Sequence, residues 1–273
     1  MPLCNMRDLL SNADKGGYAV PALSVANLEC VMGAVAAAEE LRAPIILQVA
    51  EVRLKHTPLS LIGPMMIAAA RSASVPVAVH LDHGSTLECV QQALDIGFTS
   101  VMYDGSHLPI EENLANVRKV IEMAGKTGAA VETEVGRVGR GEDGSESEAV
   151  MASLDDCFAM DAAGVDALAV GIGNAHGLYP ATPVLRYDIV EQLQGKMRAK
   201  LVLHGGTGLT DEQFQRLIAL GMRKVNIATD IFRAAATAPK CDDIFKNISG
   251  DAAAVKAVAS KYIALFGSAG KAE

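Results

Sequence analysis

The sequence predicts a closed parallel (β/α)8 barrel, and three observations carry that prediction. Short apolar or β-branched segments alternate eight times with amphipathic helical segments, which is typical of βα units in a parallel sheet. Eight such units in a chain of roughly 250 residues favour a closed barrel over an open sheet. No Pro- or Ser-rich linker interrupts the 273 residues, so we expect one domain over residues 1–273.

Each expected strand is short and ends before a polar or glycine-containing turn. In chain order the strands are expected at residues 18–22, 44–49, 77–83, 99–103, 129–134, 167–171, 200–203 and 224–227. Helices are expected after the N-cap residue Asn27 and at residues 59–72, 87–94, 111–126, 154–163 and 187–194. Capping boxes are expected at residues 85–88 and 210–213, and a helical region follows the last strand.

Composition and charge exclude several classes of protein. A hydrophobic content of 50% with 21% charged residues is typical of a compact globular chain. The net charge of −8, with no basic stripe, argues against a nucleic-acid partner, and the apolar runs are too short to span a membrane. Five scattered cysteines and the lack of a signal peptide predict free thiols in a reducing cytoplasm.

Asp82 and His83 end the third expected strand and are candidates for function. Adjacent side chains of an extended strand point in opposite directions, so one could bind a metal while the other faces a substrate. The alternative is a buried Asp–His pair that only holds a loop, and this stretch alone leaves both interpretations open.

Polar residues follow the other strands as well, and all strand ends of a barrel share one face. His83, His176 and His204 follow three different strands and could supply three nitrogen ligands, leaving one position open as in a catalytic zinc site. A lone histidine is more often a hydrogen-bonded core residue, as we expect for His80 inside a strand. Three histidines at one barrel mouth favour a metal.

Two glycine-containing loops follow the last two strands, and a longer one follows the fifth. Residues 204–207 and 226–229 could bring backbone N–H groups close to a phosphate, although a pair of tight turns is the alternative. The loop at residues 136–148 is rich in glycine and acidic residues. It could be a solvated flap or a mobile lid that carries a catalytic acid.

Together these segments resemble the class II, zinc-dependent ketose-bisphosphate aldolases, a family that includes fructose-bisphosphate and tagatose-bisphosphate aldolases. The resemblance covers nearly the whole chain and implies a (β/α)8 barrel that forms a homodimer or homotetramer. The matching segments are HLDHG at residues 80–84, SVMYDGSHLPIEEN at 100–113, VETEVGRVGRGEDG at 131–144, AVGIGNAHGLY at 169–179, LVLHGGTGL at 201–209, KVNIAT at 224–229 and the tail FGSAGKAE.

The resemblance implies a zinc-dependent enzyme that reversibly cleaves a ketose phosphate into dihydroxyacetone phosphate and an aldehyde. Asp82 would exchange a proton with the hydroxyl next to the cleaved bond, and Glu142 would act in proton transfer at the enediolate carbon. Zinc would stabilise the enediolate charge, so no lysine Schiff base is needed. The alternatives are a non-catalytic aldolase-like subunit and a fructose- or tagatose-bisphosphate aldolase proper.

The remaining roles follow the same resemblance. The implied zinc ligands are His83, His176 and His204, and the carboxylates implied to hold metal in an alternative or second position are Asp104 and Glu134. The implied pocket for dihydroxyacetone phosphate, where a monovalent cation (Na⁺ or K⁺) often helps, consists of Gly177, Gly205, Gly206, Thr207, Asn226 and Thr229.

The chain departs from the family pattern where a second phosphate would bind. Ala50 replaces a serine, and Phe232 stands where several relatives have an arginine, while Glu51 adds a carboxylate nearby. These changes predict an aldehyde without a terminal phosphate, or with a different polar end. The alternative is that Arg53, Lys55 or Arg233 replaces the missing contacts. Ala228 is closer to the tagatose-type pattern.

Overall fold

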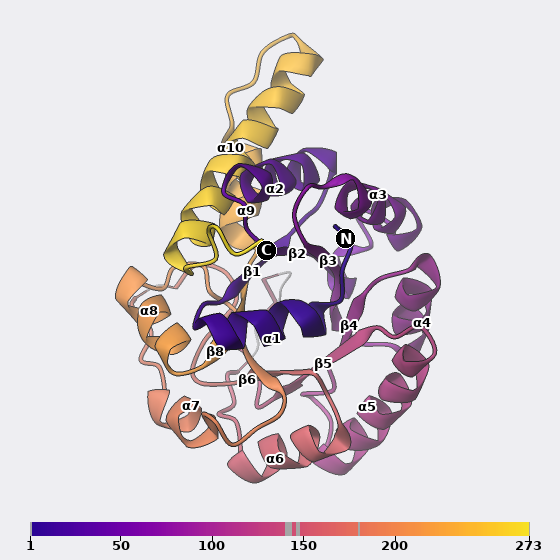
Figure 1. The fold of residues 1–273 in the computed structure, drawn as a ribbon, viewed down its shortest axis with the longest axis vertical. Coiled ribbons are helices and arrows are strands. Elements are labelled where there is room, and N and C mark those ends of the chain that lie inside the picture. The colour runs from indigo at the N-terminus through magenta and orange to yellow at the C-terminus, as the bar shows by residue number, and fades with distance from the viewer. Residues whose placement is uncertain (1, 140–143, 146–147, 180, 273) are drawn as a thin grey trace.

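The computed structural model describes residues 2–139, 144–145, 148–179 and 181–272. Eight parallel strands follow one another around a closed ring, and β1 pairs with β8 to close it, so the predicted (β/α)8 barrel is confirmed (Figure 1). The strands are β1 Val20–Ser24, β2 Ile45–Ala50, β3 Val77–Gly84, β4 Ser100–Tyr103, β5 Ala130–Val135, β6 Ala167–Val170, β7 Lys200–Leu203 and β8 Met222–Ile227.

Helices surround the barrel and cover the outer faces of its strands (Figure 1). Their caps explain where they begin: Asn27 accepts a hydrogen bond from the Cys30 N–H, and the predicted Thr210–Gln213 capping box is present. The helices are α2 Leu28–Glu40, α3 Leu59–Ser72, α4 Leu87–Ile96, α5 Ile110–Gly125, α6 Leu154–Ala163, α7 Tyr187–Leu193, α8 Asp211–Ala219, α9 Thr229–Thr237 and α10 Ile244–Leu265, with the short 3₁₀ helix η1 at Glu51–Arg53.

The capping box predicted at residues 85–88 is wrong. Thr86, not Ser85, is the N-cap of α4, and its side chain accepts from the Cys89 N–H. The N–H groups of Ser85 and Thr86 instead bond to the Glu51 carboxylate, at 2.6 Å and 3.1 Å. Glu51, from the β2–α3 connection, therefore supplies the hydrogen-bond acceptor that Glu88 would have supplied in a capping box.

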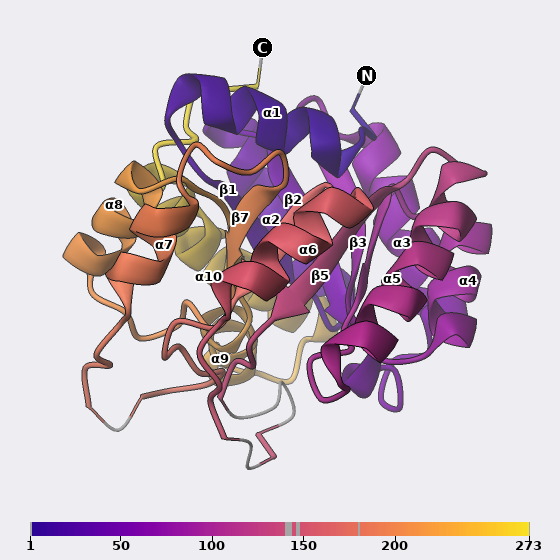
Figure 2. The ribbon, with the colours of Figure 1, turned by 90° about the horizontal axis from the view of Figure 1, so that it is seen from below.

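A helix that the sequence analysis did not anticipate closes one end of the barrel. Helix α1, Met6–Gly16, lies across the end opposite the loops that follow the strands (Figures 1 and 2). Its buried residues, Met6, Leu9, Leu10 and Ala13, recur at helical spacing and pack against small or medium side chains of the barrel interior. The interior at this end is therefore apolar and sealed.

The other half of the barrel interior is polar. Six fully or almost fully buried side chains from four strands fill it: Gln48, His80, Asp82, Glu132, Lys224 and Asn226. Buried polar groups of this kind must find partners inside the protein, because water cannot supply them. The main apolar core lies outside the barrel, between the strands and the surrounding helices.

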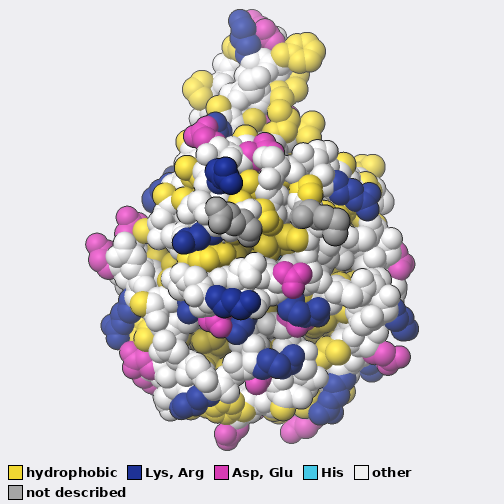
Figure 3. All heavy atoms as spheres, viewed as in Figure 1, with side chains coloured by type: hydrophobic (Ala, Val, Ile, Leu, Met, Phe, Trp, Pro, Cys, Tyr) yellow, Lys and Arg dark blue, Asp and Glu magenta, His cyan; other side chains and the backbone are white. Residues whose placement is uncertain are grey.

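Helix α10 packs along α2 and then projects beyond the barrel (Figures 1 and 3). The projecting part carries apolar side chains at its surface, where Ile244 and Phe245 are 62% and 77% exposed. Among the described residues, no helix combines the length and apolar character needed to cross a bilayer.

The contact between α2 and α10 predicts a cost for a single added methyl group. A Cβ at Gly33 would lie 2.5 Å from the Ala252 carbonyl oxygen and 2.7 Å from the Val255 Cβ. We expect Gly33→Ala to lower the free energy of unfolding by about 1–3 kcal/mol, because the helices must move apart. Urea denaturation followed by circular dichroism measures it.

The matched control is Gly125→Ala at the end of α5, where a new Cβ has no described atom within 4 Å. That variant should match or slightly exceed the parent in stability. Equal midpoints for the two variants would contradict the tight α2–α10 contact.

Candidate functional site

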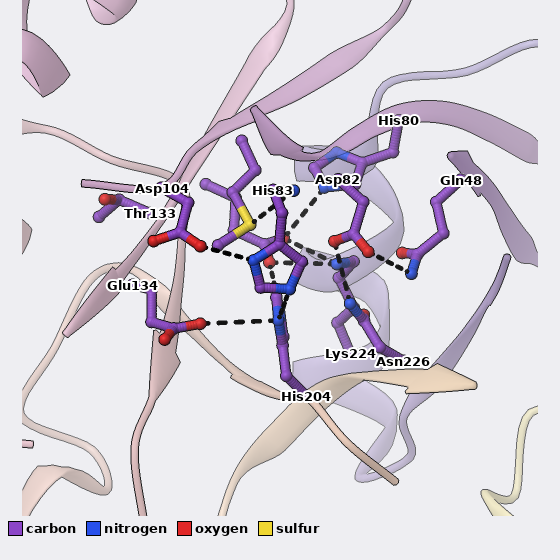
Figure 4. A network of polar contacts seen from close by, with 12 residues as sticks. Gln48, His80, Asp82, His83, Asp104, Thr133, Glu134, His204, Lys224 and Asn226 are labelled. Atoms are coloured by element: carbon purple, nitrogen blue, oxygen red, sulfur yellow. Dashed lines mark hydrogen bonds and ion pairs between the residues drawn. The ribbon is translucent and has the colours of Figure 1, made fainter. Parts of the chain in front are cut away.

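The polar strand ends gather at the mouth of the barrel, on the face opposite α1. Figure 4 shows side chains from strands β2, β3, β5 and β8 and from the turns after β4 and β7 joined in one network of polar contacts. A closed parallel barrel produces this arrangement, since every strand ends on the same face. Residues far apart in sequence thus form one site.

Strand β3 bends at its last residues, and the bend aims two side chains at this site. His83 has a φ of +44°, and the pairing of β3 with β4 shifts between Leu81 and Gly84. The expectation of opposite-facing side chains assumed an extended chain, which does not hold at His83. A bulge of this kind re-aims a side chain, and both Asp82 and His83 take part in the network (Figure 4).

The three histidines predicted as ligands lie together. Their ring nitrogens approach one another within 4.8 Å, and the His83 ring centroid is 5.0 Å from that of His176 and 4.6 Å from that of His204. His83 Nε2 lies 2.8 Å from His204 Nδ1. The structure therefore groups three imidazoles as the sequence predicted, and their role as ligands stays a prediction.

The outer nitrogen of two of these rings contacts a carboxylate. His83 Nδ1 lies 2.7 Å from Asp104 Oδ2, and His204 Nε2 lies 2.9 Å from Glu132 Oε1. Each carboxylate accepts from the ring nitrogen that it contacts, so the other nitrogen of each ring is directed toward the neighbouring imidazole. Metal-binding histidines are usually held in this way. The donor set thus suits a divalent cation such as zinc.

Asp104 and Glu134 form a second possible ligand group with His83, again within 4.8 Å. Glu134 Oε1 accepts from the Val138 N–H at 2.9 Å, while Oε2 has no hydrogen bond within the described part of the chain. Burial, reinforced by the charge of Asp104, raises the pKa of Glu134 to about 8. Without a cation, the site therefore tends to hold a proton at this carboxyl.

The charge on Asp104 also acts on His83. Burial by itself would lower the pKa of His83, but the charges of Asp82 and Asp104 outweigh it, so that this pKa lies well above its usual value. Burial would likewise raise the pKa of Asp104, yet the hydrogen bond with His83 holds that pKa below its usual range. A divalent cation would take the place of these protons.

Two amides hold the buried Asp82 carboxylate. Gln48 Nε2 donates to Oδ2 at 3.0 Å, and Asn226 Nδ2 donates to Oδ1 at 3.1 Å. Gln48 also contacts the Ser24 hydroxyl at 3.1 Å. Both carboxylate oxygens thus have a donor, and the group is fixed in one orientation at the mouth.

Three further residues of the network, Gln48, Glu132 and Lys224, were not predicted from the sequence. Gln48 interrupts an otherwise apolar strand, and a polar residue at a buried strand position, as at all three sites, requires a partner. That signal could have marked them as part of a network. His80 was expected in the core, and the structure places it there, with Nδ1 2.9 Å from the Ser100 hydroxyl.

The predicted phosphate-binding residues share one small hollow beside His176. It is lined by His176, Gly177, Gly205, Gly206, Thr207, Asn226, Ala228 and Thr229. Gly205 is required there, because its φ is +62° and a Cβ would lie 2.3 Å from the Ala175 carbonyl oxygen. The buried Thr207 hydroxyl has no hydrogen bond among the described residues, and Thr229 begins α9, so helix N–H groups end at the hollow.

The predicted lid acid, Glu142, lies outside the described residues. The start of its loop is tied to the His176 turn: the His176 N–H donates to the Gly139 carbonyl at 2.8 Å, and the Gly139 N–H donates to the Asn174 carbonyl at 3.0 Å. The loop therefore begins beside a predicted metal ligand.

The Glu51 carboxylate, expected near the far end of the substrate, accepts hydrogen bonds from Ser85 and Thr86 at the start of α4, which fix its position. Phe232 contacts Arg53, whose guanidinium carbon lies 5.6 Å from the ring centroid. Both residues line a largely apolar cavity of about 410 Å³.

Comparison with known proteins agrees with this geometry. Residues 4–271 match the family model described as "Fructose-bisphosphate aldolase class-II". A fructose-bisphosphate aldolase of Geobacillus stearothermophilus is 38% identical, with 100% of this chain and 99% of the relative covered. A 6-phospho-5-dehydro-2-deoxy-D-gluconate aldolase of Halalkalibacterium halodurans is also 38% identical, with 86% and 83% covered. The crystal structure of the YdjI aldolase from Escherichia coli K12 superimposes with a TM-score of 0.89 at 32% identity, covering 99% and 100% of the two chains.

Proposed function

The chain belongs to the class II fructose-bisphosphate aldolase family, and we propose that it is a zinc-dependent aldolase that releases dihydroxyacetone phosphate and an aldehyde from a ketose phosphate. One observation supports assigning this activity to particular residues of the barrel mouth. Three imidazoles converge at the barrel mouth, two of them held by carboxylates, and a buried aspartate held by two amides lies in the same network.

His83, His176 and His204 would hold the metal, since three imidazole nitrogens with an open fourth position suit catalytic zinc. When bound, the ion would act as a Lewis acid toward the negative charge that develops on the substrate oxygens during cleavage. The group of His83, Asp104 and Glu134 would offer an alternative position at the same mouth.

Asp82 would take the proton from the substrate hydroxyl next to the cleaved bond and return it in the reverse reaction. The amide donors of Gln48 and Asn226 leave the carboxylate with lone pairs and a fixed direction. Glu142 would exchange the proton at the carbon of dihydroxyacetone phosphate. Two different acids would thus transfer the two protons: Asp82 the hydroxyl proton and Glu142 the carbon proton.

The hollow beside His176 would bind the phosphate of dihydroxyacetone phosphate. Backbone N–H groups at the start of α9, the Thr207 hydroxyl and close-approach glycines support this use. A monovalent cation, Na⁺ or K⁺, would offset part of the phosphate charge. The residues proposed to bind are Gly177, Gly205, Gly206, Thr207, Asn226 and Thr229.

The far end of the substrate is the less constrained half of the proposal. Ala50 has no hydroxyl and Phe232 has no charge, which supports a ketose 1-phosphate rather than a ketose 1,6-bisphosphate. The Glu51 carboxylate, held by the N–H groups of Ser85 and Thr86, keeps its negative charge and would repel a second phosphate. The position of Arg53 beside Phe232 supports the alternative in which an arginine meets a second phosphate.

We further propose a homodimer or homotetramer in the cytoplasm. The exposed apolar side chains on the projecting part of α10 support association with another copy, because a monomer gains nothing from exposing them.

The first test removes a ligand. His176→Ala should lower zinc affinity by more than ~100-fold, since loss of outer partners alone usually costs ~10–100-fold. Chelator competition on metal-free protein, with metal content by mass spectrometry, gives the dissociation constant. His107→Ala, an exposed histidine, is the control and should bind zinc as the parent does. Parental zinc affinity in His176→Ala would remove this residue from the site.

The second test removes the base. Asp82→Asn should retain zinc but lose about 10²–10⁴-fold in kcat, because an amide cannot accept the hydroxyl proton. Coupled assay of dihydroxyacetone phosphate release measures the rate. Asp161→Asn serves as the control, since that carboxylate bonds to the N–H groups of Arg198 and Ala199 instead. Turnover within tenfold of the parent would assign the base elsewhere.

The third test concerns the far end of the substrate. We expect kcat/KM for ketose 1-phosphates to exceed that for the matching 1,6-bisphosphates by about tenfold or more, because each missing charged hydrogen bond costs about 1.5–3 kcal/mol. A preference for the bisphosphate that disappears in Arg53→Met would support the arginine alternative and reject the altered pocket.

A further inference from the structure

A buried ion pair lies next to the three histidines, deeper in the barrel. Lys224 Nζ is 2.9 Å from Glu132 Oε2 and 3.1 Å from Glu132 Oε1, and neither side chain is exposed. His80 Nε2 approaches the same carboxylate at 3.6 Å. The pair joins β8 to β5 through the barrel interior, and none of the predicted site roles uses it.

This ammonium supplies the positive charge that a second metal would otherwise bring. His80, Asp82 and Glu132 have ligand atoms within 4.8 Å of one another, which by spacing alone could hold a cation. Lys224 already contacts both oxygens of Glu132. The Glu132 carboxylate is therefore neutralised by Lys224. The same lysine, which lies deeper in the barrel, also fixes the orientation of the carboxylate.

The same carboxylate also contacts a predicted zinc ligand. Glu132 Oε1 accepts from both Lys224 Nζ and His204 Nε2, the latter at 2.9 Å. An acceptor at Nε2 requires the proton to be on that nitrogen, which leaves the lone pair of Nδ1 facing His83 Nε2 at 2.8 Å. His204 Nδ1 lies 3.7 Å from Glu134 Oε2, farther than Nε2 lies from Glu132 Oε1, so the orientation of Glu132 favours Nδ1 as the nitrogen that His204 offers to the mouth.

We propose that Lys224 is a positioning residue that acts through Glu132 to fix the tautomer and ring orientation of His204 for metal binding. The inference rests on the proposed metal site. A purely stabilising role explains the pair poorly, because well-packed apolar side chains often replace a buried ion pair without loss of stability. A role in orienting the His204 imidazole does explain why Lys224 and His204 contact the same Glu132 oxygen.

The experiment is a double-mutant cycle on zinc affinity. Glu132→Gln and Lys224→Met should each weaken zinc binding to metal-free protein about 10–100-fold, the usual effect of losing an outer partner. If Lys224 acts only through Glu132, the double variant should bind no more weakly than the weaker single variant. Losses that multiply in the double variant, or unchanged affinity in either single variant, would overturn the proposal.

A neighbouring ion pair on the same strand provides the control. Arg223, the residue before Lys224, faces away from the interior, and its Nε donates to Asp14 Oδ1 at 2.9 Å. Arg223→Met should change the thermal midpoint while zinc affinity stays at the parental value. A loss of zinc affinity there equal to that of Lys224→Met would show a general effect of destabilising β8 and reject a positioning role.

A spectroscopic readout does not depend on metal or activity. In metal-free protein with ¹⁵N-labelled imidazoles, His204 should carry its proton on Nε2 in the parent and should populate the other tautomer in Glu132→Gln. If Lys224→Met does not fold, Glu132→Gln decides, and unchanged affinity and tautomer there would refute the inference. Failure of the parent to bind zinc would instead refute the proposed function.

Discussion

The buried Glu132 carboxylate is the interaction on which the upper barrel depends. A charge with no solvent contact is costly unless it is paired and hydrogen-bonded, and here three nitrogens approach it, two from strands β3 and β8 and one from the turn after β7. Removing any one partner would leave a buried charge less well satisfied. The polar interior therefore has to be assembled as a set, and the histidine at the mouth forms part of the same set as the lysine below.

This polar half can exist because the other half is apolar and closed. Helix α1 packs its apolar stripe onto small residues at the opposite end, including Ala22, Ala78 and Ala167. The barrel interior is thus divided along its axis, with close packing at one end and charged groups at the other. The division follows from the order of residues along each strand, since apolar residues precede the polar residue in β2 and β3.

The sequence predicted the parts of the site that are local and missed those that depend on partners across the barrel. Each histidine lies at or after the end of its own strand, so one segment at a time was enough to find His83, His176 and His204. The role of Gln48 is clear only from its contact with Asp82, 34 residues away. The role of Glu132 is clear only from its contact with Lys224, 92 residues away. The register of β2 on β3 brings the first pair together, and closure of the barrel brings the second pair together across the interior; no single segment reveals either.

Helix α1 and the left-handed turn at His83 were missed for different reasons. The helix precedes the first repeat, so the strand–helix alternation does not include it. The turn requires a backbone conformation that is uncommon for a side chain other than glycine, and only the pairing between β3 and β4 reveals it. Glu142 remains a prediction from the resemblance alone.

The cap formed by α1 also determines how the interior can exchange with the surroundings. Among the described residues, α1 packs against one end of the barrel, so the mouth would be the shorter route by which water and protons reach the buried Glu132, Lys224 and His80. A ligand bound at the mouth would then block the entry of water and protons as well as react. The protonation states of these buried groups would then stay fixed while the ligand is bound. They would equilibrate with the bulk pH only after the ligand dissociates.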